Sequence, residues 1–276
     1  MKKAMKILSL ATALISMTTG VALATPSTQI WSPSPDVQPF GVLHLGIDNY
    51  FRASNKPKSP PTAAATRDAN IYDIGLTVGV LPFEKLQMEV GVDYLVSANE
   101  PNDNHPFSFN VKLGTPEDSL FKGSPAIAVG IYNAGPTNYD GPSSGSLGRA
   151  VGITSGQNIT YGLIAKTLPA IGAVPSLGRI SAGGYHGSAR AFVDPNGNSA
   201  NDGVILTWDR TMSEISDKLW MAVDYFGGNN VNGALNIGFA WSFAKNVSVI
   251  FAYDIYKEKA LAGNNTFTTQ LDINFP

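Results

Sequence analysis

The stretch Leu235-Asn236-Ile237-Gly238-Phe239-Ala240-Trp241-Ser242-Phe243 alternates between large apolar residues and small or polar ones. Successive side chains of a β-strand point to opposite faces of its sheet, so this period of two predicts a strand with one apolar face. The other face carries glycine, alanine, serine and asparagine, without the lysine and glutamate that usually cover a water-facing surface. This combination favours a sheet with lipid on its apolar side and a crowded polar interior on the other.

The same alternation recurs along most of the chain. Clear examples lie at residues 43–52, 73–80, 87–94, 247–255 and 267–275, and weaker ones at 107–113, 126–133, 158–168, 179–186, 204–210 and 219–226. Together with the first stretch they predict about twelve strands, and an even number returns both chain ends to one side. Bilayer hydrocarbon cannot hydrogen-bond a free strand edge, so a spanning sheet has to close on itself.

The connections between these strands differ in length in a regular way. The odd-numbered connections are mostly long and polar, at residues 53–67, 99–105, 134–156, 187–202, 227–232 and 258–265. The even-numbered ones are generally shorter, at 82–85, 115–124, 169–178, 212–218 and 245–246. Long external loops at one rim and short periplasmic turns at the other are typical of outer-membrane barrels. We therefore predict an all-β fold, a closed antiparallel transmembrane β-barrel over residues 39–276.

The first residues have the features of a signal peptide. Three lysines precede the apolar run 7–17, which is too short to span a bilayer as a helix, and Ala22-Leu23-Ala24 provides small residues at a cleavage position. We expect residues 1–24 to be removed and the mature chain to begin at Thr25. Residues 25–38 are rich in Pro, Ser and Thr, and we expect an extended lead-in located in the periplasm.

Composition excludes several classes of site. The chain has no cysteine, so it can form neither disulfides nor thiolate metal sites. Without the three leader lysines, the 19 basic residues fall to 16 against 21 acidic ones, a formal charge of −5 that argues against nucleic acid as a partner. With three histidines in all, His44 is interpreted as an ordinary interior residue. We expect neither a metal nor a cofactor.

Aromatic residues gather at strand ends on the predicted lipid face, where interfacial girdles form in membrane barrels. They are Phe51, Tyr94, Phe107, Tyr161, Trp208, Tyr225, Trp241, Phe243, Tyr253 and Phe275. High β propensity of aromatic residues is the alternative explanation for any one of them.

With its leader, its alternation and its terminal strand, the chain resembles the class of bacterial outer-membrane β-barrel proteins, which are porin-like in architecture. The resemblance implies a location in the outer membrane of a Gram-negative bacterium, contact with outer-membrane lipid, and a final strand that the barrel-assembly machinery reads. In this sequence the aromatic residue Phe275 is followed by Pro276, which departs slightly from the usual pattern of an aromatic final residue. Monomers and trimers both occur in the class. By resemblance to general porins, the third long loop, 134–156, is a candidate for folding inward.

The favoured function is a channel for passive diffusion of small polar solutes, with a mild preference for cations because acids outnumber bases on the predicted inner face. The predicted pore-lining residues are Asp48, Arg52, Asp73, Glu89, Asp93, Lys112, Lys166, Arg179, Asp224 and Asp254. Asp209 and Asp272 belong to the same inward set. The alternative is that these groups pair with one another and fill a narrow interior.

Two further functions remain open, because barrels of this kind also include enzymes and adhesins. His186 and Ser188 resemble the histidine and serine two apart on the outer face of outer-membrane lipid hydrolases. Such a pair needs a third polar residue to orient the histidine, and the matching region 196–202 is predicted as loop with no registered partner. We therefore do not expect an enzyme. A non-conducting structural or adhesive barrel is the other alternative.

Overall fold

The structure, a computed structural model, describes residues 28–54, 70–97, 106–136, 156–172 and 176–276. Within these ranges the chain forms twelve β-strands and one short helix. They are β1 (Leu43–Arg52), β2 (Ile71–Gly79), β3 (Gln87–Ser97), β4 (Phe107–Thr115), β5 (Ala126–Ala134), β6 (Ile159–Leu168), β7 (Gly178–His186), β8 (Asp202–Thr211), β9 (Leu219–Phe226), β10 (Ala234–Ala244), β11 (Val247–Tyr256), α2 (Lys259–Ala262) and β12 (Thr266–Phe275). The prediction of twelve strands is confirmed. No helix in the described ranges is long and apolar enough to cross a bilayer.

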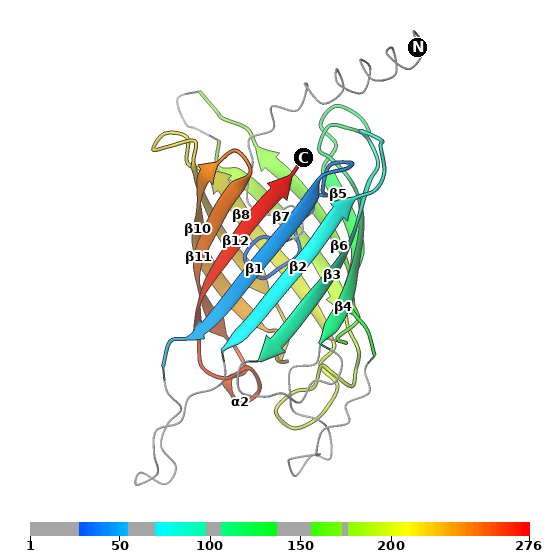
Figure 1. The fold of residues 1–276 in the computed structure, drawn as a ribbon, viewed down its shortest axis with the longest axis vertical. Coiled ribbons are helices and arrows are strands. Elements are labelled where there is room, and N and C mark those ends of the chain that lie inside the picture. The colour runs from blue at the N-terminus through cyan, green and yellow to red at the C-terminus, as the bar shows by residue number, and fades with distance from the viewer. Residues whose placement is uncertain (1–27, 55–69, 98–105, 137–155, 173–175) are drawn as a thin grey trace, which may run out of the picture.

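Each strand pairs antiparallel with its neighbours in sequence, and the first strand pairs with the last, so the sheet closes into a barrel (Figure 1). The closing ladder runs from the pair Leu43 and Phe275 to the pair Arg52 and Thr266. Closure leaves no strand edge with unpaired backbone groups, which is the condition for a sheet in hydrocarbon. The predicted closed antiparallel barrel is therefore confirmed.

The wall of the barrel has its apolar side outside. In β10, Asn236 is 0% exposed while the adjacent Ile237 is 47% exposed. The other strands follow the same alternation: the outer surface carries Leu76, Phe109, Val129, Ile164, Val204, Phe239 and Phe267, all exposed. Water-soluble monomers rarely expose a continuous apolar surface of this extent. The arrangement suits a barrel surrounded by lipid.

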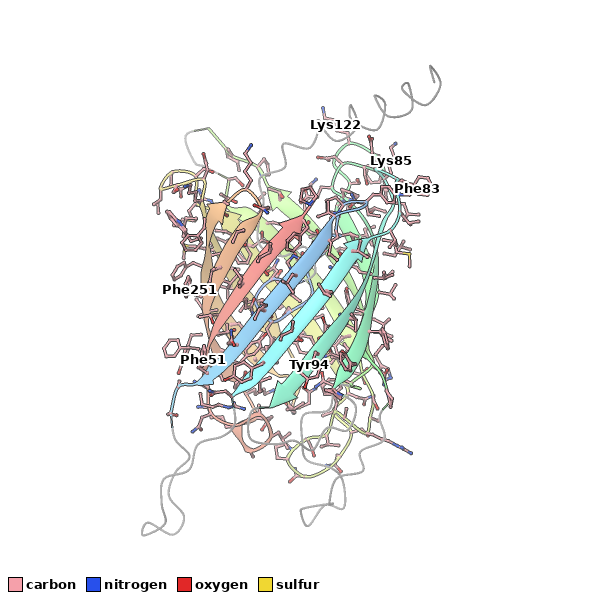
Figure 2. The ribbon with its side chains drawn as sticks, in the orientation of Figure 1. Phe51, Phe83, Lys85, Tyr94, Lys122 and Phe251 are labelled. Atoms are coloured by element: carbon pink, nitrogen blue, oxygen red, sulfur yellow. The ribbon has the colours of Figure 1, made fainter. Side chains whose placement is uncertain are left out.

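Successive connections alternate between the two ends of the barrel, as expected for sequential antiparallel strands. Figure 1 places the β10–β11 hairpin and the C-terminus at one rim, which we call the short-turn rim, and α2 at the other, the long-loop rim. Phe51 and Tyr94 lie near the long-loop rim, whereas Phe83, Lys85 and Lys122 lie at the short-turn rim (Figure 2). Both rims thus carry aromatic side chains, as the girdles of membrane barrels do.

An apolar cluster fills part of the interior near the long-loop rim. Phe192, from the connection between β7 and β8, is fully buried and packs with Tyr185, Ile205 and Phe226. A Cβ atom at Gly187 would lie 2.2 Å from the Phe192 ring, so a glycine is needed where the chain turns inward. The loop expected to fold inward, 134–156, lies mostly outside the described residues. The next long connection, which carries Phe192, does fold inward.

Candidate pore and the chain segment inside it

Three carboxylates form a row on the inner wall of β1, β2 and β3. Asp48 lies directly opposite Asp73, and Asp93 lies opposite Gly75. A Cβ atom at Gly75 would lie 2.5 Å from Oδ1 of Asp93, so a side chain at this position would displace that carboxylate. The glycine on the polar face therefore makes room for the row. We call Asp48, Asp73 and Asp93 the carboxylate row.

The carboxylate row has few partners. The Tyr50 hydroxyl donates to Oδ2 of Asp48 at 3.4 Å, and the Asn110 amide donates to Asp93. Oδ1 of Asp73 is buried and has no hydrogen-bond partner among the described residues. Across the same residues, none of the three carboxylates forms an ion pair with a basic side chain. The carboxylate row is thus left without a basic side chain as a partner among the described residues.

A cavity of about 170 Å³ adjoins the carboxylate row. Its wall includes Asp272, Glu89, Lys112 and His44, and it reaches Asn232 and Ala262 at the long-loop rim. The rest of its lining includes aromatic and aliphatic side chains, some of them beside the carboxylate row on β1 and β2, namely Trp31, Tyr50, Ile71, Tyr132, Tyr161, Val231 and Tyr256. The cavity thus combines carboxylates with apolar surface.

Residues 28–38, which we call the luminal segment, run through the interior of the barrel, where Figure 1 shows the blue start of the described chain behind β1 and β12. Oδ2 of Asp224 accepts three backbone N–H groups of this segment, from Ile30 at 2.9 Å, Trp31 at 2.8 Å and Ser32 at 3.1 Å. Hydrogen bonds to a carboxylate are stronger than those between neutral groups. Asp224 therefore fixes the innermost part of the luminal segment.

The other end of the luminal segment is held by charged side chains. Arg179 donates to both carboxylate oxygens of Asp36, at 2.6 and 2.7 Å, and Nζ of Lys112 donates to the Asp36 carbonyl at 2.7 Å. The Gln38 N–H donates to Oε2 of Glu89 at 2.6 Å. Burial alone would raise the pKa of Asp36, but the adjacent Arg179 guanidinium holds that pKa below its usual value. Both ends of the segment are thus bonded to the wall.

This position corrects one expectation. Residues 25–38 were predicted as an extended lead-in located in the periplasm, whereas residues 28–38 lie inside the barrel. The prolines do keep this stretch out of the sheet ladder, as predicted. Several of its backbone N–H groups donate to side chains of the inner wall instead. Alternation within the strands could not reveal this, because the partners are nearly two hundred residues away.

The remaining predicted pore residues fall into different settings. Nη1 of Arg52 donates to the carbonyls of Ala262 and Asn264, each at 2.8 Å, near the long-loop rim. Asp254 is buried and accepts a hydrogen bond from Thr266 at 2.6 Å. Arg179 also donates to Asp209 at 3.0 Å, so it is engaged with two carboxylates. These groups support the wall and the luminal segment more than they line open space.

The prediction that Lys166 faces the lumen is wrong. Its side chain is 40% exposed and pairs with Glu117 and Asp118 of the β4–β5 turn, at 3.1 and 3.4 Å. The inward residues of β6 are instead Tyr161, Leu163 and Ala165, all buried, so Tyr161 does not belong to the outer aromatic girdle. The alternation in β6 misled the prediction because the inner face is the more apolar one, so the polar residues Thr160 and Lys166 lie outside.

No protein-family model matches this chain, and no curated protein matches it. Two solved structures illustrate its similarity to known barrels. An outer membrane channel from Pseudomonas putida F1 aligns with a TM-score of 0.44 and 10% identity, over 92% of this chain and 99% of that chain. OmpF of Salmonella typhi, solved in complex with daunomycin, aligns with a TM-score of 0.39 and 7% identity, over 85% and 97%. At such low sequence identity and TM-score, neither match identifies a substrate for this chain.

His186 does have an acidic partner, which the sequence did not reveal. Asp202 begins β8 directly opposite His186, and its Oδ1 lies 2.7 Å from Nδ1 of the histidine, on the exposed outer side of the barrel. Ser188 accepts a backbone hydrogen bond from Arg190 at 3.4 Å, and within the described residues no hydrogen bond joins it to His186. A nucleophile and its base need such contact, so the arrangement is incomplete as it stands.

His44 lies on the inner wall beside acceptors rather than in a metal site. Its Nδ1 is 3.0 Å from Oδ1 of Asn274, and its Nε2 is 3.6 Å from Oδ1 of Asp272. In the ranges that the structure describes, no group of three or more histidine, aspartate or glutamate side chains is arranged to hold a metal ion. A hydrogen-bonded interior histidine, as interpreted from the sequence, agrees with these contacts.

Proposed function

We propose that this protein is an outer-membrane channel of a Gram-negative bacterium for the passive diffusion of small polar solutes. One observation carries the proposal: a closed barrel with an apolar outer surface encloses a cavity lined by carboxylates. An apolar exterior is what lipid requires, and a polar interior is what a diffusing polar solute requires. Outer-membrane lipid and the barrel-assembly machinery are the partners that such a protein needs.

The charges around the cavity support a mild preference for cations. Lys112 is 3.1 Å from Glu89, and Arg179 is bonded to Asp36 and Asp209, so these bases are close to acids that offset them. The carboxylate row has no such compensation. A lumen with an excess of negative charge attracts cations and raises the energy of anions.

This preference gives a direct measurement. In planar bilayers under a KCl gradient, we expect the reversal potential to indicate selectivity for K⁺ over Cl⁻. Replacing Asp73 with Asn should lower the permeability ratio at least about five-fold, because a unit charge about 4 Å from K⁺ in water changes the energy of K⁺ by about 1 kcal/mol.

The matched control is Asp217→Asn, which removes the same charge from the exposed β8–β9 turn and should leave the ratio nearly unchanged. A wild-type channel that favours Cl⁻, or equal effects of the two substitutions, would count against the proposed preference.

Lipid hydrolysis is the second candidate, favoured by the short contact between His186 and Asp202. Since Ser188 is not hydrogen-bonded to the histidine, we expect vesicles of fluorescent phospholipid to release no fatty acid when the folded protein is added. If the wild-type protein released fatty acid and the His186→Ala variant did not, the protein would be a lipid hydrolase instead. Absence of both conductance and lipid release would favour a structural or adhesive barrel.

A further inference from the structure

The carboxylate row lacks a positive partner. The fold brings its carboxylates close together and buries one of their oxygens, so the lack of a partner is unfavourable. Asp48 and Asp73 are direct cross-strand neighbours, and like charges in this position repel each other. Oδ1 of Asp73 is buried without a hydrogen-bond donor among the described residues, and Asp73 lines the cavity. A buried carboxylate oxygen without a donor destabilises the fold. A cation in the cavity would reduce the repulsion between these carboxylates.

The aromatic and aliphatic part of the cavity lining suits an organic body better than a hydrated ion. The Trp31 ring lies 5.2 Å from that of Tyr50 and 5.8 Å from that of Tyr256, both in edge-on geometry. Ile71 and Val231 add aliphatic surface to the same cavity. Aromatic faces attract organic cations, and apolar walls favour apolar groups that leave water.

The size of the cavity limits the occupant. A cavity of about 150 Å³ holds a molecule as large as benzene. The cavity of about 170 Å³ therefore accepts a single ring or a short alkyl chain with a charged head.

We propose that this cavity binds a small organic cation, with its ammonium or amidinium head against the carboxylate row and its apolar body against Trp31 and the neighbouring aromatic rings. This inference rests on the proposed channel function, since it names the class of solute that the channel takes. The head provides several N–H donors for Asp48, Asp73 and Asp93, and the body replaces water against the apolar wall.

Isothermal titration calorimetry on the mature protein folded in detergent micelles tests the proposal with three probes of different charge. We expect benzylammonium to bind at least about ten-fold more tightly than benzyl alcohol, because a hydrogen bond to a charged group is worth about 1.5 kcal/mol or more. CaCl₂ as the third probe is expected to bind more weakly than benzylammonium. Equal affinities for benzylammonium and benzyl alcohol, or binding of Ca²⁺ alone, would overturn the proposal.

Variants locate the binding. Asp73→Asn should weaken benzylammonium binding about ten-fold and leave benzyl alcohol nearly unaffected, whereas Asp217→Asn should change neither. An unchanged affinity for benzylammonium in Asp73→Asn would place the site elsewhere and overturn the assignment. The comparison of probes on the wild-type protein stands even where a variant fails to fold.

Planar-bilayer conductance distinguishes failure of this inference from failure of the channel function. A conducting protein that does not distinguish benzylammonium from benzyl alcohol is a channel without the proposed site. A protein that binds benzylammonium but conducts no ions has the site without the channel function.

Discussion

Deletion of residues 28–38 is expected to raise the single-channel conductance of the barrel several-fold. Gln29, Ile30, Ser32 and Ser34 are almost completely buried in the lumen, so the segment occupies cross-section through which ions would otherwise pass. The strand ladders do not include this segment, and β1 pairs with β12 along its whole length without it. The deletion should therefore leave the barrel closed.

A second variant tests the same idea while keeping the chain length. Asp224→Ala removes the acceptor of three backbone N–H groups, so the luminal segment should leave the lumen part of the time. We expect brief steps to a higher conductance in bilayer recordings, and none in Asp217→Asn. Identical conductance in the wild type, the deletion and Asp224→Ala would mean that the segment does not obstruct the path of ions.

Introducing a charge on the outer surface is expected to have the largest effect on stability. Ile164 is exposed near the middle of β6, and arginine at the bilayer midplane of a barrel costs about 2–4 kcal/mol. We therefore expect Ile164→Arg to lower the free energy of unfolding in phospholipid vesicles by this amount. Guanidinium titration followed by tryptophan fluorescence measures the loss.

Ile215 provides the matched control because it is exposed in the β8–β9 turn, outside the strands. Ile215→Arg should change the free energy of unfolding by about 0.5 kcal/mol or less, as exposed positions usually do. If Ile164→Arg were equally harmless, the outer surface would be facing water, and the membrane location would have to be abandoned.

The strands were predictable because their two faces differ in chemistry. In β10 each large apolar residue alternates with a small or polar one, so both the strand and its orientation follow from the sequence. In β6 the inner face belongs to an apolar cluster containing Tyr161 and Leu163, whereas Lys166 is on the outer face, so the usual contrast between the faces is reversed. Periodicity then still indicates a strand but no longer says which side faces inward, which explains the error at Lys166.

The carboxylate row was predictable residue by residue, but its setting was not. Alternation places Asp48, Asp73 and Asp93 on the inner face, whereas the cavity beside them depends on what else enters the lumen. Trp31 belongs to a proline-rich stretch without periodicity, and its contacts, Asn232 in the β9–β10 connection and Tyr256 on β11, lie far away along the chain. Contacts of that range depend on the register of the whole closed sheet, which local sequence patterns do not contain.

The luminal segment also bears on how the two ends of the chain are joined. It precedes β1 directly, yet its carbonyl at Ile30 accepts a hydrogen bond from Gln270 at 2.7 Å, and Gln38 donates to Asn274 at 2.9 Å, both on β12. The pairing of β1 with β12 is therefore stabilised by the backbone ladder and also by the contacts that the luminal segment makes with β12 inside the barrel. These two contacts need β12 in place beside β1, so closure of the cylinder and docking of the luminal segment stabilise each other.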